Sequence, residues 1–296
     1  MSDGKSLRYE VVDVFAEAPY AGNPLAVVRG GAELETATLQ AIAREMNLSE
    51  TTFVLRDAAR DGAFDVRIFT PGKELPYAGH PTLGTAFVIR AALLGDGVSE
   101  LALRLGIGPV RVRFASDGLV WLTAPHASFG PAPDASAVAA ALGLQADALD
   151  PRLPIEIATT GEHQLLVPVR DLTALRRCRV DSGAYQRLRG AGAPASLYAF
   201  TREARDPRNH FSVRLFAPDA GVPEDPATGS AAGWLGAYLA RHRVLGSGDF
   251  DVRVEQGHEI LRPSLLHVRA RGSGDASEIS VGGRVIRVAR GELVSL

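Results

Sequence analysis

The sequence predicts an α+β fold built from two pseudo-symmetric domains, each a curved, mostly antiparallel sheet around a central helix. Three observations lead to this prediction: a repeat within the chain, strand-like alternation ahead of each copy, and an apolar helical run after each copy. The chain has 296 residues, and 46% of them are hydrophobic. That is enough apolar material for two ordinary domain cores.

The repeat consists of two phrases that occur in the same order in each half. Asp65–Pro71 (DVRIFTP) is similar to Ser212–Pro218 (SVRLFAP). His80–Ala86 (HPTLGTA) is similar to Asp225–Ala231 (DPATGSA), which begins 145 residues later. Because two separate phrases recur in one order, we interpret the chain as a duplication.

Each copy of the repeat predicts a strand, a polar loop and a helix. Apolar and polar residues alternate over 64–68 and again over 211–215, as in a strand with one buried face. Pro81 and Pro226 suit the first turn of a helix, and Asp225 is expected to be the N-cap residue of the second one. Apolar residues at helical spacing then predict helices that stop at glycines. These glycines are Gly95 and Gly246.

The remaining chain is predicted to contain short strands and two smaller helices. One helix is expected over Thr36–Met46 and another between Asp134 and Gly143. The domains are expected to span 1–130 and 131–296, with the extreme C-terminal strand free to pack with the N-terminal domain. The predicted strands are Tyr9–Phe15, Leu25–Val28, Thr52–Leu55, Val110–Phe114, Leu119–Thr123, Gln164–Val169, Ser196–Phe200, Leu265–Ala270 and Arg284–Val288.

Composition argues against several classes of function. The formal net charge is −2, without the basic excess of a nucleic-acid-binding protein. No window approaches the roughly 18 apolar residues of a membrane span. The chain has one cysteine, Cys178, which favours a reducing cytoplasm over an oxidising compartment. The seven histidines lack the spacing of a metal site, so no metal is expected.

The loops of the repeat predict a site for a small carboxylate. In a duplicated protein the two helix N-termini can face one another, where unpaired N–H groups and the positive ends of the helix dipoles attract an anion. Gly79 and Gly229 permit close approach of a ligand, and the hydroxyls of Thr228 and Ser230 can bind it. The alternative is that Pro and Gly in these loops only mark turns.

Three side chains are candidates for moving protons. Glu50 lies between a helix end and an apolar strand, a position that can project a carboxylate into a cleft. His80 is either a loop-capping donor or a partner that orients an acid. The third candidate is Asp225. The simpler alternatives are that Glu50 is a solvated loop residue and that Asp225 is only an N-cap residue.

A series of short phrases runs in order over nearly the whole chain. The phrases are Asp13–Phe15 with Gly22–Val28, Asn47–Thr51, Phe69–Pro71, Ala78–Thr82, Glu224–Ala231 and Gln256–Gly257 with Arg262–Ser264. With these phrases the chain resembles the PhzF-like phenazine-biosynthesis family. Leu261 stands where that family often has Gly before Arg-Pro-Ser.

The resemblance implies a diaminopimelate-epimerase-like fold with the site between two domains, a homodimer, and isomerisation of trans-2,3-dihydro-3-hydroxyanthranilate without a cofactor. It places the catalytic acid/base on Glu50 and the assisting residues on His80 and Asp225. Gly229 and Ser230 are expected to contact substrate. The matching phrases add four further substrate-binding residues: Asn23, Ser49, Gly79 and Thr228.

Three functions therefore stand as hypotheses. In the first, Glu50 removes a proton from an activated carbon of a small unsaturated amino acid and returns it at a distant carbon on the same face. In the second, the protein is an epimerase or racemase of an amino or hydroxy acid, with Asp225 or His80 as the second base. Relatives that racemise with two thiols have a cysteine in each paired loop, and this chain has none there. In the third, it is a homologue that binds a carboxylate without catalysis.

Overall fold

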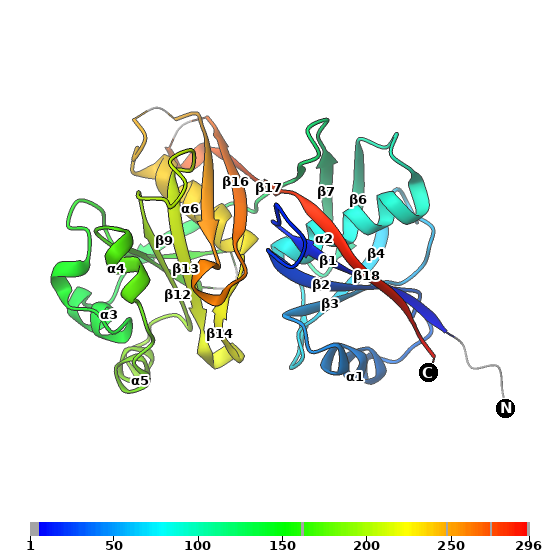
Figure 1. The fold of residues 1–296 in the computed structure, drawn as a ribbon, viewed down its shortest axis with the longest axis horizontal. Helices are drawn as coiled ribbons and strands as arrows, with labels where there is room; N and C mark the ends of the chain where they lie inside the picture. Colours follow the sequence, from blue (N-terminus) through cyan, green and yellow to red (C-terminus); the bar gives the residue numbers. More distant parts are fainter. Residues whose placement is uncertain (1–5, 161–162, 247, 273, 295–296) are drawn as a thin grey trace. The chain divides into compact units, whose positions relative to one another are not determined.

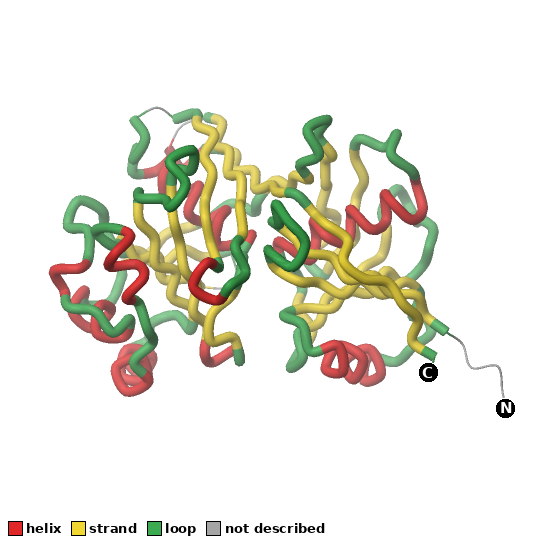
Figure 2. The backbone as a smooth tube through the Cα atoms, in the orientation of Figure 1, coloured by secondary structure: helices red, strands yellow, loops and turns green. Residues whose placement is uncertain are grey.

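The protein is described here by a computed structural model that covers residues 6–160, 163–246, 248–272 and 274–294. The chain divides into two compact units. Unit 1 comprises Met1–Thr123 and Gly282–Leu296, and unit 2 comprises Ala124–Val281. Both units combine a mainly antiparallel sheet with a few helices, as expected for an α+β protein (Figure 1 and Figure 2).

Unit 1 contains a sheet in which β1 is paired with β18 on one side and β2 on the other, followed by β3 and β4. Strand β4 also pairs with β5 and β6, and β6 continues into β7 and β8. Its elements are β1 (Leu7–Val14), β2 (Asn23–Arg29), α1 (Thr36–Met46), β3 (Glu50–Val54), β4 (Phe64–Phe69), β5 (Glu74–Leu75), α2 (Gly79–Ile89), η1 (Arg90–Leu94), β6 (Glu100–Leu105), β7 (Gly108–Phe114), β8 (Val120–Thr123) and β18 (Val285–Leu293).

Helices α1 and α2 lie on opposite sides of the first strands of unit 1 (Figure 1). Helix α1 buries Leu39 against a small core that includes Phe53 and Phe69, whose rings meet edge to face at 5.5 Å. Helix α2 is apolar nearly all round and approaches the sheet closely at Gly84. A methyl group at Gly84 would lie 2.6 Å from Leu25, so only glycine lets the helix pack this tightly.

Unit 2 contains a sheet running β9, β10, β11, β12, β13, from which β14 and β15 branch, and β15 continues into β16. Its elements are β9 (Ser128–Pro131), α3 (Ala135–Ala141), η2 (Ala146–Ala148), β10 (Glu156–Thr159), β11 (His163–Pro168), α4 (Leu172–Arg177), α5 (Ser182–Gly190), β12 (Ser196–Thr201), β13 (Phe211–Ala217), η3 (Pro218–Ala220), β14 (Val222–Asp225), α6 (Gly229–Arg241), β15 (Phe250–Gln256), η4 (His258–Ile260), β16 (Ser264–Arg271), η5 (Gly274–Ala276) and β17 (Glu278–Gly283), whose last two residues belong to unit 1.

The two faces of the unit 2 sheet carry different helices. Alternate residues such as Leu197, Ala199 and Phe216 belong to the core shared with α3, α4 and α5. The other face packs on α6, where the rings of Phe200 and Tyr238 meet at 5.4 Å. Because successive residues of a strand point to opposite faces, each side chain of β12 and β13 can be assigned to one of these two layers.

Strand pairing repeats between the units, which supports the duplication seen in the sequence. The parallel pair β2–β3 corresponds to β11–β12, and the antiparallel pair β3–β4 corresponds to β12–β13. The hairpin β4–β5 corresponds to β13–β14, and the parallel pair β4–β6 to β13–β15. Each unit then places its apolar helix, α2 or α6, after the hairpin.

The register of the second repeated phrase differs from the sequence expectation. His80 is the second residue of α2, whereas Asp225 is the last residue of β14. The expectation that Asp225 caps α6 was therefore wrong, as was the place of Pro226 in the first turn, because α6 begins at Gly229 with Thr228 as its N-cap residue. The hairpin of unit 2 is also the longer one, since Leu215 pairs with Asp225 whereas Ile68 pairs with Leu75, so the second phrase does not begin at equivalent positions in the two units.

Two further boundaries differ from the expected ones. Helix α6 ends at Arg241 and His242 caps it, so the helix stops before the expected Gly246. The contacts place residues 124–130 in unit 2, whereas the expected domains met at residue 130. They place β18 in unit 1, in line with the expectation that the extreme C-terminal strand can pack with the N-terminal domain. Strand β18 belongs with unit 1 because it forms a ladder with β1 from Leu7↔Leu293 to Val14↔Val285.

Candidate functional site

In unit 1 the structure brings together three of the predicted site residues. Glu50 is the first residue of β3, Asn23 the first of β2, and His80 the second of α2. The parallel pairing of β2 and β3 sets Glu50 beside Leu25, two residues after Asn23. Oε2 of Glu50 lies 3.2 Å from Nε2 of His80, and Nδ2 of Asn23 donates to Nδ1 of His80 at 3.4 Å.

Burial keeps the His80 imidazole neutral. Its side chain is 6% exposed, and desolvation lowers its pKa to about 3. Because Nδ1 accepts from the Asn23 amide, the ring carries its proton on Nε2, which is the nitrogen that faces Glu50. The Glu50 carboxylate, 15% exposed, therefore faces a neutral N–H group rather than a competing acid.

The other two predicted residues of unit 1 flank this group. Ser49 directly precedes Glu50 and is partly exposed, and Gly79 is buried at the first position of α2. No side chain caps the N-terminus of α2: the N-cap residue, Ala78, makes no side-chain hydrogen bond. The first N–H groups of α2 are the kind of donors that attract an anion.

In unit 2 the predicted residues Asp225 and Thr228 are in direct contact. The Thr228 hydroxyl donates to Oδ2 of Asp225. The buried amide of Gln256 braces the loop between them: Nε2 donates to the Asp225 carbonyl at 2.9 Å, and Oε1 accepts from the Thr228 N–H at 3.1 Å. Gly229 and Ser230 follow as the first two residues of α6. As in α2, the side chain of the N-cap residue of α6 accepts no hydrogen bond from the first N–H groups of the helix.

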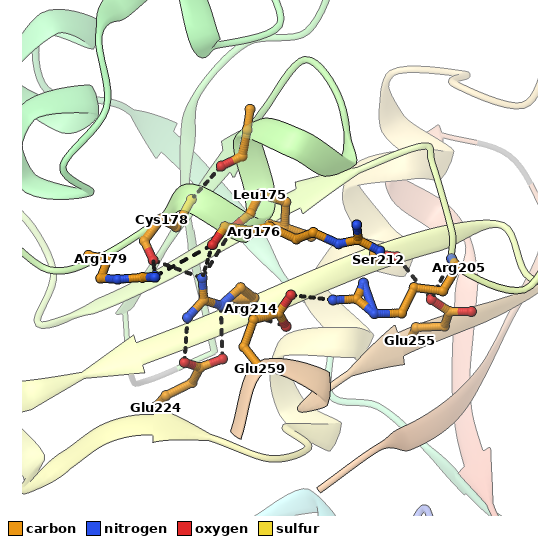
Figure 3. Close-up of polar contacts among 11 residues, drawn as sticks. Leu175, Arg176, Cys178, Arg179, Arg205, Ser212, Arg214, Glu224, Glu255 and Glu259 are labelled. Carbon is orange, nitrogen blue, oxygen red and sulfur yellow. Dashed lines mark hydrogen bonds and ion pairs between the residues drawn. The ribbon is translucent and has the colours of Figure 1, made fainter. Parts of the chain in front are cut away.

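Arg214 holds β14, the strand that ends at Asp225, against its neighbours. Arg214 of β13 donates from Nε and Nη2 to the two carboxylate oxygens of Glu224, at 2.9 and 2.6 Å, and Glu224 is the residue before Asp225 (Figure 3). Nη1 of Arg214 donates to the carbonyl of Cys178 at 2.7 Å, at the end of α4. Arg214 and Glu224 are only 5% and 9% exposed, so their forked ion pair is buried.

The same device occurs in unit 1. Arg67 of β4 donates in a fork to Glu74 of β5, and its guanidinium lies 5.0 Å from the ring of Phe69. The corresponding Arg214 lies 4.8 Å from the ring of Phe216. The repeated Val-Arg-x-Phe phrase thus has a structural meaning in each unit: its arginine ties the hairpin that leads to the apolar helix.

Sequence reasoning missed Gln256, Arg214 and the role of Glu224. Gln256 was visible only as part of a family phrase, and no local pattern says that its amide turns back to the Asp225 loop. Arg214 did carry a signal, since the arginine recurs in both copies of the repeat. Among the predicted residues, the structure brings Glu50, His80 and Asn23 together in unit 1 and Asp225 and Thr228 together in unit 2, where Gln256 braces their loop.

Cys178 is not placed for chemistry. Its side chain is buried at the end of α4, and burial raises the pKa of the thiol to about 12. Within the described part of the chain, no three His, Cys, Asp or Glu side chains gather as they would to hold a metal ion. Among the described helices, none is long and apolar enough to cross a membrane.

Comparison with protein families gives a match over nearly the whole chain. Residues 12–291 match the PhzC-PhzF family of phenazine biosynthesis-like proteins. The trans-2,3-dihydro-3-hydroxyanthranilate isomerase of Pseudomonas aeruginosa is 38% identical over 288 residues, which cover 96% of this chain and 98% of that protein. A second protein with the same description, from Pseudomonas chlororaphis, is 36% identical over 97% of this chain and 99% of its own length.

Solved structures resemble the chain over its full length. The phenazine biosynthesis protein of the PhzF family from Bacillus anthracis superposes with a TM-score of 0.88 at 27% identity, covering 98% of this chain and 99% of its own. A Pseudomonas aeruginosa protein described as a predicted epimerase gives 0.80 at 36% identity, with coverage of 98% and 100%. A hydroxyproline epimerase from Agrobacterium vitis gives 0.59 at 13% identity over 97% of this chain and 92% of its own, which shows a shared fold alone. These likenesses confirm the expected epimerase-like α+β fold.

Proposed function

Because the chain belongs to the PhzC-PhzF family of phenazine biosynthesis-like proteins, whose named relatives above are isomerases, we propose that it is a cofactor-independent isomerase. It moves a proton on a small unsaturated carboxylate, and the substrate of those relatives, trans-2,3-dihydro-3-hydroxyanthranilate, is the leading candidate. The observation that carries this proposal is the contact between Glu50 and the neutral imidazole of His80.

Glu50 is the proton carrier in this mechanism. As a carboxylate it removes a proton from a carbon activated by the conjugated system. After the resulting acid has exchanged its proton with water, it delivers a proton to a distant carbon on the same face. His80 does not compete for the proton, because its pKa of about 3 keeps the ring neutral. Its N–H instead orients the Glu50 carboxylate, and Asn23 holds the ring in the tautomer that makes this possible.

The remaining predicted residues bind and orient the substrate. We assign binding of the substrate carboxylate to N–H groups at a helix start, for which Gly79 is the candidate in unit 1 and Gly229 and Ser230 are the candidates in unit 2. Asp225 and Thr228 take the amino or hydroxyl group of the substrate, and Ser49 and Asn23 contact it beside Glu50. These groups supply orientation, which fixes the carbon that Glu50 reaches.

The test is turnover in deuterated water with wild type and Glu50→Gln. We expect the wild-type product to gain one deuterium at the carbon that receives the proton. Glu50→Gln is expected to lower kcat by at least about a hundredfold, the lower range of general acid–base catalysis, while the folded structure is kept. The matched control is Glu45→Gln, an exposed glutamate of α1, which is expected to leave kcat unchanged. Near-normal turnover by Glu50→Gln would remove Glu50 from the mechanism.

An epimerase or racemase is the second candidate, favoured by the similarity to the protein described as a predicted epimerase. In that reaction Glu50 and Asp225 or His80 would act on opposite faces of one stereocentre. The same labelling experiment separates the two, because epimerisation exchanges the hydrogen of the existing stereocentre and labels no new carbon. A third outcome, binding of carboxylates with no exchange of any hydrogen, would identify a homologue that binds its ligand without catalysis.

We also propose that the protein works as a homodimer in the cytoplasm, with a small carboxylate as partner and neither nucleic acid nor membrane. A single, buried cysteine suits a reducing compartment. Light scattering during size-exclusion chromatography measures the mass, and we expect twice that of one chain. A monomer at micromolar concentration would contradict the dimer and leave the proposed chemistry untouched.

A further inference from the structure

Tyr198, which the proposed mechanism does not use, shares a row of the unit 2 sheet with Asp225. Tyr198 of β12 pairs with Leu215 of β13, and Leu215 pairs with Asp225 of β14. Residues directly opposite one another in neighbouring strands point to the same face. Tyr198 and Asp225 are two strands apart, about 9–10 Å between backbones, so a tyrosine and an aspartate side chain together span the gap.

That face is the one packed on α6. Phe200, two residues after Tyr198 and therefore on the same side of β12, contacts Tyr238 of α6. The opposite face, with Leu197 and Ala199, belongs to the core on α3, α4 and α5. Tyr198 therefore lies in the layer between the sheet and the helix whose N-terminus follows the Asp225 loop.

The equivalent row of unit 1 has a different chemistry. There Thr52 pairs with Ile68, and Ile68 pairs with Leu75. The Thr52 hydroxyl shares a 2.7 Å hydrogen bond with Thr85 of α2, so the helix satisfies this hydroxyl internally. Unit 2 replaces the threonine by the much longer Tyr198 and the apolar Leu75 by Asp225. The row in unit 2 thus contains two ionisable groups, whereas the equivalent row in unit 1 contains none.

The Tyr198 hydroxyl is buried and unused. The residue is 0% exposed, and its hydroxyl has no hydrogen-bond partner among the described residues. A buried hydroxyl without a partner costs about 1–3 kcal/mol. The other two fully buried tyrosines of this unit do have partners: Tyr185 donates to the Ala195 carbonyl at 2.8 Å, and Tyr238 donates to the Pro154 carbonyl at 2.6 Å.

We propose that Tyr198 is a positioning residue for Asp225: its hydroxyl is a second donor to the Asp225 carboxylate, beside that of Thr228. This inference rests on the proposed role of Asp225 in binding the substrate. In the present arrangement the Thr228 hydroxyl occupies Oδ2 of Asp225. When substrate engages Asp225, the phenol holds the carboxylate in place and keeps it oriented toward the substrate.

The phenol is suited to donate at any working pH. Burial raises the pKa of Tyr198 far above its ordinary value, and the negative charge of Asp225 raises it further. The group therefore stays protonated and uncharged. A neutral donor beside a carboxylate favours the ionised form of that carboxylate, which is the form that accepts hydrogen bonds from a substrate amino or hydroxyl group.

The first experiment compares Tyr198→Phe with wild type in kinetics and thermal unfolding. Removing the hydroxyl is expected to lower kcat by about tenfold to a hundredfold, the range for a hydrogen bond to a charged group, and to raise KM as well, because the phenol orients the carboxylate that binds the substrate. The melting temperature is expected to stay the same or rise, because no internal hydrogen bond is lost. An unchanged kcat in Tyr198→Phe would overturn the inference.

Tyr185→Phe and Tyr238→Phe are the matched controls, and they are expected to show the opposite pattern. Each removes a hydroxyl that donates to a backbone carbonyl, so each variant melts at a lower temperature with kcat unchanged. If all three variants lose activity in proportion to stability, the effect of Tyr198 is structural and the inference fails.

A second readout does not depend on turnover and separates this inference from the proposed function. The carboxyl carbon of Asp225 is followed by NMR in a pH titration and identified by its loss in Asp225→Asn. With saturating 2-aminobenzoate, a stable carboxylate that carries an amino group, present throughout the titration, we expect the apparent pKa of Asp225 to be higher in Tyr198→Phe than in wild type, and unchanged in Tyr238→Phe. If wild type isomerises no unsaturated carboxylate, the proposed function fails while this titration still decides the pairing. An identical Asp225 titration in Tyr198→Phe contradicts the pairing.

Discussion

At the scale of single residues, burial of His80 makes a prediction about pH. Its pKa is about 3 in the folded protein and near 6.5 in an unfolded chain. Between these values the unfolded state binds more protons. The free energy of unfolding therefore falls as pH is lowered from about 6.5 toward 3, by at most about 1.4 kcal/mol per pH unit. Replacing His80 with glutamine removes this dependence.

The measurement is urea unfolding at pH 7.5 and pH 5.0. On acidification wild type is expected to lose about 2 kcal/mol more than His80→Gln, because only wild type has this buried, neutral imidazole. The control is His163→Gln, an exposed histidine of β11, which is expected to follow wild type. Parallel losses in wild type and His80→Gln would show that His80 titrates normally in the folded state, against the mechanism proposed for Glu50.

At the scale of elements, the ion pairs Arg214–Glu224 and Arg67–Glu74 are expected to differ in how much they contribute to the free energy of unfolding, although the arginine belongs to the same sequence motif in both units. Arg214 and Glu224 are nearly fully buried, whereas Arg67 and Glu74 are 27% and 40% exposed. Removing one partner of a buried ion pair leaves an uncompensated charge and costs about 3–5 kcal/mol, while an exposed pair contributes up to about 1 kcal/mol. We expect Arg214→Met to lose several times more unfolding free energy than Arg67→Met in denaturant titrations. Equal losses would mean that burial does not determine how much each ion pair contributes to the free energy of unfolding.

A glycine behind the Asp225 loop gives a second prediction at this scale. Gly257 has a φ of +77°, and a methyl group there would lie 2.6 Å from the Pro226 carbonyl oxygen and 2.3 Å from that of Arg262. Backbone atoms cannot yield as a side chain does. Gly257→Ala is therefore expected to shift the residue that follows Asp225, lowering stability by more than the roughly 1–2 kcal/mol of left-handed strain and lowering kcat as well.

Gly192→Ala is the matched control for Gly257→Ala. Gly192 has a φ of +90°, but a methyl group there meets no described atom within 4 Å. Gly192→Ala therefore introduces the left-handed backbone strain without a steric clash. The residue lies at the end of α5. We expect a modest loss of unfolding free energy and an unchanged kcat. Comparable kcat losses in the two variants would show that backbone strain alone, and not contact with Pro226, explains the effect.

Strong local patterns made part of this element structure predictable. Helix α1 spans Thr36–Met46 as predicted, because its apolar residues recur at helical spacing. The short helices α4 and α5 were missed, although Asp171 and Asp181 cap them by accepting from N–H groups three residues on. Strand β15 was also missed despite its alternation of buried and exposed side chains over Phe250–Gln256. These signals are short, and each is weak without its tertiary partner.

The sequence predicted which residues belong to the candidate site, but it did not predict which side chains hold them in place. Glu50 and His80 were singled out by loop position and by family phrases, and the structure places their side chains in contact. Asn23 and Gln256 hold His80 and the Asp225 loop from distant strands, at separations of 57 and 31 residues. No local pattern encodes such pairs, because they depend on how strands are ordered in the sheet. The false N-cap at Asp225 has the same origin, since Asp225 is held in β14 by its pairing with Leu215 of β13.

At the scale of the whole molecule, the last strand of the C-terminal half belongs to the sheet of the N-terminal unit. Each half repeats the same succession of paired strands, but β18 leaves the second half and completes the sheet of unit 1. Unit 1 is therefore discontinuous in sequence, and its two ends pair as neighbouring strands. It follows that unit 1 cannot complete its sheet without β18, whereas unit 2 is continuous in sequence.

This arrangement predicts that shortening the C-terminus damages unit 1 and spares unit 2. A chain that ends at Val281 lacks β18, which leaves the edge of β1 unpaired from Leu7 to Val14. Hydrogen exchange read by mass spectrometry is expected to show at least about tenfold faster exchange in β1 and β2, while α6 and β15 keep their protection because their contacts lie within unit 2. A chain that ends at Leu293 is the control and keeps β18 whole. If both units lost protection together in the shorter chain, the two would form one cooperative body, and the division of the molecule into a discontinuous and a continuous half would have no thermodynamic meaning.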